Sequence, residues 1–215
     1  MPPKSNPDAA RFRRRLAAWF RRAGRDLPWR RTRDPYAIVV SEFMLQQTQV
    51  SRVLDYYPRF LSWYPTVHSL ARARPAAVRE SWEGLGYYRR AANLHALARR
   101  VVREHGGSLP SDVETLRGLP GIGMYTAGAV ACFAYERPAA TVDTNVARVL
   151  GRVFGKKKGL VELALSLQPR AGKAAWTFNQ ALMELGALVC TARKPKCGEC
   201  PVKSQCRYAG LATPK

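Results

Sequence analysis

Apolar residues recur at helical spacing along almost the whole chain, and this periodicity constrains the fold more than any other feature. Phe12, Leu16, Trp19 and Phe20 fall at positions i, i+4, i+7 and i+8, with arginines between them. This is the pattern of an amphipathic helix with a basic outer face. The two β-branched runs, AIVVS and RVVRE, are too short and too isolated to build a sheet. The 215-residue chain is therefore predicted to be all-α.

Further helices are predicted from the same periodicity and from their start signals. Asp34 followed by Pro35 is typical of an N-cap and a first helical turn, and it opens a helix through YAIVVSEFMLQQ. Ser111 and Glu114 fit a capping box at the start of a short helix over 111–117. The other predicted helices cover 49–63, 75–82, 88–105, 124–135, 144–153, 160–167 and 173–189.

The charge of the chain indicates the kind of partner. Lys and Arg total 36 against 15 Asp and Glu, which gives a formal net charge of +21. A compact body with this charge attracts polyanions, and nucleic acid is the partner that such a charge favours. A basic protein without any polyanionic partner is the alternative. No apolar run approaches the ~18 residues of a membrane span, so no membrane partner is expected.

A glycine turn connects two of the predicted helices. The segment LPGIG contains Leu119, Gly121 and Gly123, directly before the helix that begins at Met124. Two glycines two residues apart permit a tight turn and a close backbone approach, and the following helix N-terminus offers free N–H groups to a phosphate. We interpret this as a helix-hairpin-helix motif that binds the DNA backbone. A plain helix connector is the alternative.

Four cysteines fall within 17 residues near the end of the chain, with the spacing C-x6-C-x2-C-x5-C. Zn²⁺ and a [4Fe–4S] cluster both bind four thiolates, but zinc sites usually carry two C-x2-C pairs and this segment has one. The spacing therefore favours the cluster. The predicted ligands are Cys190, Cys197, Cys200 and Cys206. The remaining cysteine, Cys132, lies in the apolar stretch AVACFAY and is predicted to be buried.

Cations separate the first two of these cysteines. Arg193, Lys194 and Lys196 are candidates for phosphate contacts from a loop that the metal would hold in place. A purely structural role for the loop is the alternative, and both roles can hold at once.

Two carboxylates lie in apolar surroundings. Glu42 lies within IVVSEFML, and Asp143 lies within ATVDTNVARVL. An acid at such a position is costly unless it has a partner or a function. Gln46 lies four residues after Glu42, on the same helix face, and is a candidate for contact with DNA. Each acid could also be a satisfied structural residue.

These segments together resemble the adenine DNA glycosylases of the MutY type, which belong to the helix-hairpin-helix superfamily that also contains endonuclease III. The resemblance runs from LPWR and SEFMLQQTQV through WEGLGYYRRAANLH, HGG, LPGIGMYTAGAV and VDTNVARVL to the cysteine segment, and covers roughly residues 27–206. It implies a two-lobed all-α glycosylase fold with an iron–sulfur loop. The implied lobes are a six-helix barrel over 29–136, and an iron–sulfur lobe of 1–28 with 137–215.

The resemblance also implies catalytic roles. Glu42 matches the acid that protonates the departing adenine, and Asp143 matches the carboxylate that stabilises the sugar cation. Asn145 matches a residue that assists near Asp143. Tyr125 stands where the endonuclease III branch has its Schiff-base lysine, so a monofunctional enzyme with weak or no lyase activity is implied.

Other implied roles concern DNA. Gln47 and Tyr87 match side chains that wedge into the duplex around a mismatch, and mismatched double-stranded DNA is the implied partner of a monomeric enzyme in the bacterial cytoplasm, at the nucleoid. The family's usual C-terminal domain, which recognises 8-oxoguanine, is expected to be missing, because nine residues follow Cys206. A G:T or G:U mismatch glycosylase therefore stays open as an alternative to adenine excision, and a non-catalytic iron–sulfur DNA-binding module is a second alternative.

Overall fold

The computed structural model describes residues 7–170 and 172–211. Within these ranges all regular secondary structure is helical, which confirms the all-α prediction. None of the described helices is both long enough and apolar enough to cross a membrane. The chain divides into two compact units, one formed by the described parts of 1–25 and 136–215 and the other by 26–135. Each unit is described by itself below.

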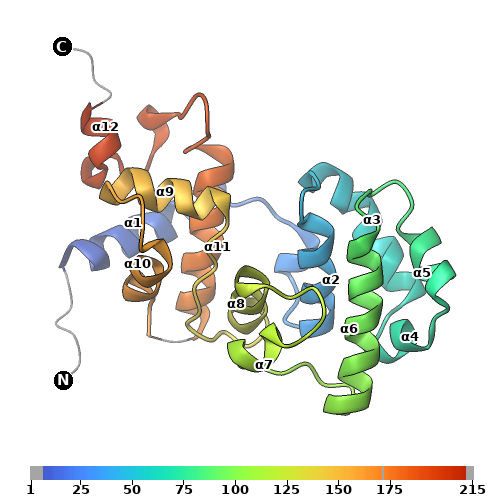
Figure 1. Ribbon diagram of the computed structural model, residues 1–215. Coiled ribbons are helices and arrows are strands. Elements are labelled where there is room, and N and C mark those ends of the chain that lie inside the picture. The colour runs from blue at the N-terminus through green and yellow to red at the C-terminus, as the bar shows by residue number, and fades with distance from the viewer. Residues whose placement is uncertain (1–6, 171, 212–215) are drawn as a thin grey trace. The chain divides into compact units, whose positions relative to one another are not determined.

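The unit of residues 26–135 has one 3₁₀ turn and seven α-helices (Figure 1). They are η1 (Pro28–Arg30), α2 (Pro35–Leu45), α3 (Val50–Trp63), α4 (Val67–Arg72), α5 (Pro75–Ser81), α6 (Arg89–His105), α7 (Val113–Arg117) and α8 (Met124–Phe133).

Two helices of this unit are buried almost all round. Every residue from Tyr36 to Met44 in α2 is buried, and so is every residue from Thr126 to Phe133 in α8. A helix that is apolar on all faces can only be stable inside a domain, and α2 packs against α3, α6 and α8. Asp34 caps α2 as predicted, because its side chain accepts a hydrogen bond of 3.0 Å from the backbone N–H of Tyr36.

Two sequence expectations for this unit were wrong or incomplete. Ser111 and Glu114 do not form a capping box, because α7 begins at Val113 and its N-cap is Asp112, whose carboxylate accepts a 2.8 Å bond from the N–H of Thr115. Helix α4 was not predicted at all. Its six residues are too few to show periodicity, and it is held by its own capping box and by packing on α6.

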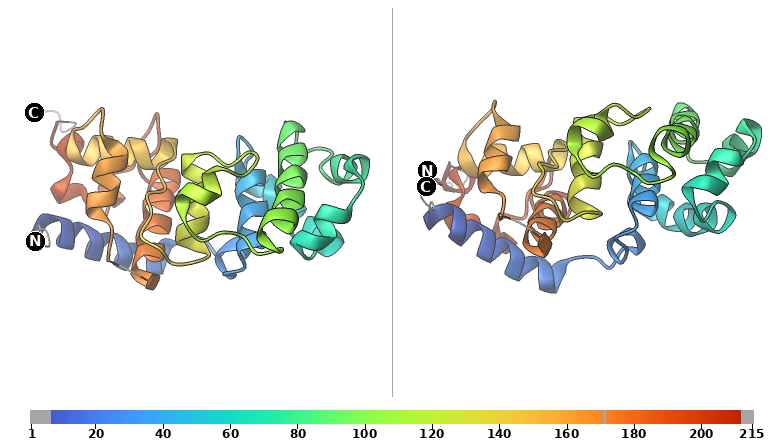
Figure 2. Two further views of the ribbon diagram at one scale, coloured as in Figure 1. Left: turned by 60° about the horizontal axis from the view of Figure 1, so that its bottom comes forward. Right: turned by 90° about the horizontal axis from the view of Figure 1, so that it is seen from below.

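The other unit contains α1 (Pro7–Ala23), α9 (Thr144–Phe154), α10 (Leu160–Leu167), α11 (Gly172–Leu188), η2 (Cys197–Glu199), η3 (Lys203–Gln205) and α12 (Arg207–Leu211). Helix α11 packs against both α1 and α9 (Figure 2). The predicted apolar face of α1 is confirmed, since Phe12 and Leu16 are fully buried. Phe12 makes edge-on contacts with Phe154 and Phe178, so residues far apart in sequence share one core.

A buried ion pair holds the end of the first segment of this unit. Glu184 of α11 is 1% exposed and accepts bonds from Nε and Nη2 of Arg25 at 2.8 and 2.9 Å. The backbone N–H of Arg25 donates to the same carboxylate at 2.9 Å. Three donors on one carboxylate compensate much of the desolvation that its burial costs.

Candidate active site

Asp143 lies at the N-terminus of α9 and serves as its N-cap. Oδ1 accepts a bond of 2.7 Å from the backbone N–H of Val146, and Oδ2 accepts a bond of 3.1 Å from Nδ2 of Asn145. The negative charge complements the positive end of the helix dipole. Both carboxylate oxygens are thus held by donors of one helical turn, and the half-buried side chain has a fixed orientation.

A chain of hydrogen bonds connects Asp143 to the cysteine segment. Oδ1 of Asn145 accepts a 2.6 Å bond from Nη2 of Arg148, and Nε of Arg148 donates a 2.7 Å bond to the carbonyl oxygen of Cys190. Arg148 also donates to the carbonyl oxygen of Gly186 at 2.9 Å. A carboxylate that the resemblance marks as catalytic and a residue predicted to bind the cluster are therefore joined through two intervening side chains.

Arg152, one turn further along α9, lies against the cysteine segment itself. Its Nη1 is 3.5 Å from Sγ of Cys190 and donates to the carbonyl oxygen of Thr191 at 2.7 Å. The guanidinium lies over the ring of Tyr208, 4.7 Å from its centroid. The thiol of Cys206 is 3.6 Å from the carbonyl oxygen of Arg152. The two arginines thus hold the cysteine segment against α9.

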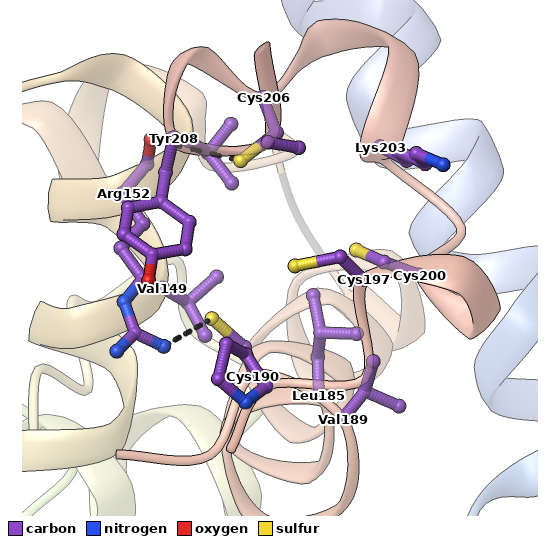
Figure 3. Close-up of a pocket in the computed structure, with 13 residues that line it drawn as sticks. Val149, Arg152, Leu185, Val189, Cys190, Cys197, Cys200, Lys203, Cys206 and Tyr208 are labelled. Carbon is purple, nitrogen blue, oxygen red and sulfur yellow. Dashed lines mark hydrogen bonds between the residues drawn. The ribbon is translucent and has the colours of Figure 1, made fainter. Parts of the chain in front are cut away.

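The four predicted cysteine ligands line one cavity. Figure 3 shows their sulfur atoms around this space, beside Arg152 and Tyr208. Apolar side chains of Val149, Leu185 and Val189 form part of its wall. These predicted ligands are Cys190, Cys197, Cys200 and Cys206.

The geometry of these thiols fits an iron–sulfur cluster. Thiols spread around a common cavity suit a cluster, in which each thiolate binds its own iron. Burial raises the pKa of the Cys200 thiol to about 11, so binding of iron, which needs the thiolate, is coupled to proton release.

Glu42 lies on the buried helix α2 of the other unit. It is 4% exposed, and its neighbours along the helix, Ser41 and Phe43, are also buried. The ring of Phe43 contacts the hairpin, because a Cβ on Gly121 would lie 2.8 Å from its Cε1 atom. Glu42 is thereby held on a helix that packs directly on the predicted hairpin motif.

The chain leaves α2 through two residues that were predicted to contact DNA. Gln46 is the C-cap of α2, and Gln47, which follows, is exposed with φ at +55°. Tyr87 also has positive φ, +48°, and is 60% exposed. Left-handed backbone at a non-glycine residue costs of order 1 kcal/mol and is common at functional sites.

The hairpin separates into structural and exposed positions. Leu119 is buried, so its side chain packs inside the protein and only its backbone could face a ligand. Gly121 and Gly123 are both exposed, but Gly121 has φ of +76° and no room for a Cβ, whereas a Cβ on Gly123 would stand in open space. Gly123 is the N-cap of α8, and Tyr125 is half-buried in the first turn. The exposed backbone N–H groups of this turn can bind an anion.

The three cations of the cysteine segment are exposed. These side chains, of Arg193, Lys194 and Lys196, lie at the surface and not in the core. The loop that carries them is held by a hydrogen bond of 2.7 Å, which Oγ1 of Thr191 donates to the carbonyl oxygen of Lys194. A firmly held basic loop is suited to phosphate.

Two models of known protein families match the chain. The family model described as "HhH-GPD superfamily base excision DNA repair protein" matches residues 40–166, which is more than half of the chain. The chain belongs to the HhH-GPD superfamily. A second model, the iron–sulfur binding domain of endonuclease III, matches residues 190–206. The predicted HhH-GPD fold and the [4Fe–4S] cofactor are thereby confirmed.

Individual HhH-GPD relatives make the resemblance more specific. The chain is 47% identical to an adenine DNA glycosylase of Mycolicibacterium smegmatis, over 93% of this chain and 70% of the relative. It is 46% identical to the adenine DNA glycosylase of Rattus norvegicus, over 93% of this chain but only 42% of the relative. The chain thus spans less than half the length of the rat protein. The predicted resemblance to adenine DNA glycosylases is confirmed.

The fold also matches a solved structure of this superfamily. A thermostable thymine-DNA glycosylase superimposes with a TM-score of 0.89 and 34% identity, over 95% of this chain and 98% of the other.

Three arginines of the site were not found from the sequence. Arg90 is buried beside the left-handed residues, Arg148 joins Asn145 to Cys190, and Arg152 lies against the cysteine segment. The spacing of Arg148 gave a usable signal, since Asn145, Arg148 and Arg152 share a helix face at i, i+3 and i+7. No local signal distinguishes Arg90 from its exposed neighbour Arg89.

Proposed function

We propose that this chain is a monofunctional DNA glycosylase that hydrolyses the N-glycosidic bond of a mispaired adenine opposite guanine or 8-oxoguanine. The observation that carries the proposal is the held carboxylate of Asp143, oriented by Val146 N–H and by Asn145. Breaking a glycosidic bond develops positive charge on the sugar, and a fixed anion stabilises that charge. The identity of 46–47% to adenine DNA glycosylases supports adenine as the base.

Glu42 is the proposed proton donor. A departing base leaves more readily when an acid protonates it, and a positioned acid typically contributes ~10²–10⁴-fold in rate. The target nucleotide must be flipped out of the duplex to reach such groups. Glu42 is buried in α2, where a helix surrounded by packed neighbours holds it still.

Tyr125 supports hydrolysis without a lyase step. A phenol oxygen cannot form the imine through which an amine nucleophile cleaves the DNA strand. We therefore propose weak or no strand cleavage by the enzyme itself. Tyr125→Lys tests this proposal: the variant should give a covalent adduct that borohydride traps, while the wild type should trap poorly.

In this proposal the protein binds DNA through the sugar–phosphate backbone. The turn at Gly123 offers backbone N–H groups at the N-terminus of α8, and Arg193, Lys194 and Lys196 offer charge. The cluster, bound by the four cysteines, holds the basic loop. Nothing in this scheme needs a second copy of the chain, and the proposed enzyme acts as a monomer at the bacterial nucleoid.

Thymine or uracil excision from G:T and G:U mismatches is the second candidate. It is favoured by the TM-score of 0.89 to a thymine-DNA glycosylase. The identity to that structure, 34%, is lower than the identity to the adenine enzymes, so adenine excision is preferred.

A panel of duplexes separates these candidates. The full chain is incubated in excess with DNA carrying A opposite 8-oxoguanine, A opposite G, T opposite G or U opposite G, and alkali then cleaves abasic sites. Fastest cleavage at adenine supports the proposal, and cleavage only at T or U supports the second candidate. Tight binding without cleavage of any duplex would indicate a non-catalytic DNA-binding module.

A further inference from the structure

The two exposed left-handed residues of the 26–135 unit lie on either side of one buried guanidinium. In the described part of the chain, the non-glycine residues with positive φ are Gln47, Tyr87 and Glu136, and the first two flank Arg90. Arg90 is the second residue of α6 and is 7% exposed. A charged group so deeply buried is retained only where it makes many compensating bonds.

Nη1 of Arg90 holds the end of α2. It donates to the carbonyl oxygens of Phe43 at 3.0 Å and Met44 at 2.8 Å, and it also contacts the carbonyl oxygen of Gln46. The last carbonyls of a helix have no partner within the helix, and a cation there satisfies both their bonds and the helix dipole. The bond to Gln46 fixes the residue immediately before Gln47.

Nη2 of Arg90 holds the other side of Gln47 and the approach to Tyr87. It donates to Oγ1 of Thr48 at 3.0 Å, and to the carbonyl oxygens of Leu85 at 3.0 Å and Gly86 at 3.1 Å. The guanidinium is 5.5 Å from the centroid of the Tyr87 ring, which is a cation–π distance. Both left-handed residues are therefore bracketed by bonds from the same group.

Strained backbone persists only where its surroundings over-determine it. Gln47 and Tyr87 are exposed polar and aromatic side chains, the types that insert between bases or read their edges. We infer that Arg90 is the positioning residue that holds Gln47 and Tyr87 together in the conformation that enters the duplex beside the flipped base. This inference rests on the proposed function and adds to it the residue on which recognition of the opposing base depends.

Substitution at Arg90 can be matched for charge. Arg90→Lys keeps the charge but loses the planar fork, so one ammonium cannot reach both loops. Arg89→Lys is the control, because Arg89 is the exposed neighbour on the same helix turn. Thr48→Val is a milder second variant, since it removes one acceptor of Nη2 at nearly constant size. Circular dichroism first identifies the variants that fold.

The readout is the fluorescence of 2-aminopurine placed next to a mismatch, whose emission rises when an inserted side chain unstacks it. At saturating protein, Arg90→Lys and Thr48→Val should give a smaller rise than wild type, while Arg89→Lys should match wild type. Single-turnover excision by Arg90→Lys should fall roughly tenfold or more, as expected when a buried bond network is left incomplete, and the preference between 8-oxoguanine and other opposing bases should narrow.

Folded variants with wild-type emission and wild-type opposing-base preference would overturn the inference. The proposed function fails by a different result. If the wild type raises the 2-aminopurine emission but excises no base from any duplex, the excision proposal is wrong, while the emission of the variants still decides the role of Arg90.

Discussion

Asn145 donates a hydrogen bond of 3.1 Å from Nδ2 to Oδ2 of Asp143, and its own amide oxygen accepts from Arg148. The amide of Asn145 therefore fixes the position of the Asp143 carboxylate. The bond from Arg148 of α9 in turn fixes the position of that amide. The other oxygen of Asp143 accepts a bond from the backbone N–H of Val146.

Asn145→Ala should slow excision without unfolding the protein. The variant loses the bond to Oδ2 and leaves Arg148 short of an acceptor, and a deletion of this kind costs about 1–3 kcal/mol. A fall of roughly tenfold or more in the single-turnover rate is expected at unchanged DNA affinity. Thr144→Ala, at the exposed neighbouring position, is the control. Equal rates for wild type and Asn145→Ala would show that the amide does not position Asp143.

The two glycines of the hairpin should respond differently to alanine. A Cβ added at Gly123 would have no atom within 4 Å, so Gly123→Ala should fold normally. The added methyl group should weaken DNA binding, because it obstructs the approach of the DNA backbone to this turn. At Gly121 the φ of +76° and the contacts at 2.8 Å with Asn93 and Phe43 make Gly121→Ala destabilising. Fluorescence anisotropy with two unrelated duplexes measures the affinity, and thermal melts measure the stability. The hairpin assignment fails if Gly123→Ala binds both duplexes as tightly as wild type.

The sequence predicted the helices more accurately than the hydrogen-bond partners of individual side chains. The apolar faces of α1 and α2 follow from periodicity, because burial of one face or of all faces leaves a mark in every turn. The six residues of α4 are too few to show such periodicity. The N-cap of α7 is Asp112 and not the predicted Ser111, because several side chains at a helix start compete for the same N–H groups. Both errors concern features that are only one or two helical turns long.

The site was predicted only where its chemistry is local. The four cysteines lie within one short segment, so their spacing indicated a common site. The bonds from Arg148 to Cys190 and from Arg90 to Phe43 join residues more than 40 positions apart. Nothing in a sequence taken alone shows such pairs, since they arise when helices pack.

The purified protein should be brown, with broad visible absorption and about four irons per chain from the [4Fe–4S] cluster. Cys200→Ser should lower the iron content, the thermal stability and the DNA affinity together, because the basic loop loses its anchor. Cys132→Ser, at a fully buried position that does not line the cavity, should keep the iron and the affinity. One zinc and no iron in the metal analysis would contradict the cluster.

The ion pair between Arg25 and the buried Glu184 should contribute more to the free energy of unfolding than the exposed pair between Asp26 and Arg31. Glu184→Gln leaves the guanidinium of Arg25 without its charged partner, and because Arg25 is 36% exposed and partly rehydrated, a loss of about 2 kcal/mol in the free energy of unfolding is expected. Asp26→Asn breaks the exposed pair with Arg31 and should leave stability unchanged. Urea titration of both variants measures the difference. Equal stabilities would show that the buried pair makes no special contribution.

We propose that Glu42 and Asp143 carry out base excision, and single-turnover excision of adenine opposite 8-oxoguanine or guanine tests this proposal most directly. Glu42→Gln and Asp143→Asn keep size and shape but remove the proton donor and the stabilising anion. Each should slow excision by ~10²–10⁴-fold or more while affinity for the same duplex stays close to wild type. Wild-type excision rates in a folded Glu42→Gln or Asp143→Asn protein would contradict the proposed catalytic role of the substituted carboxylate.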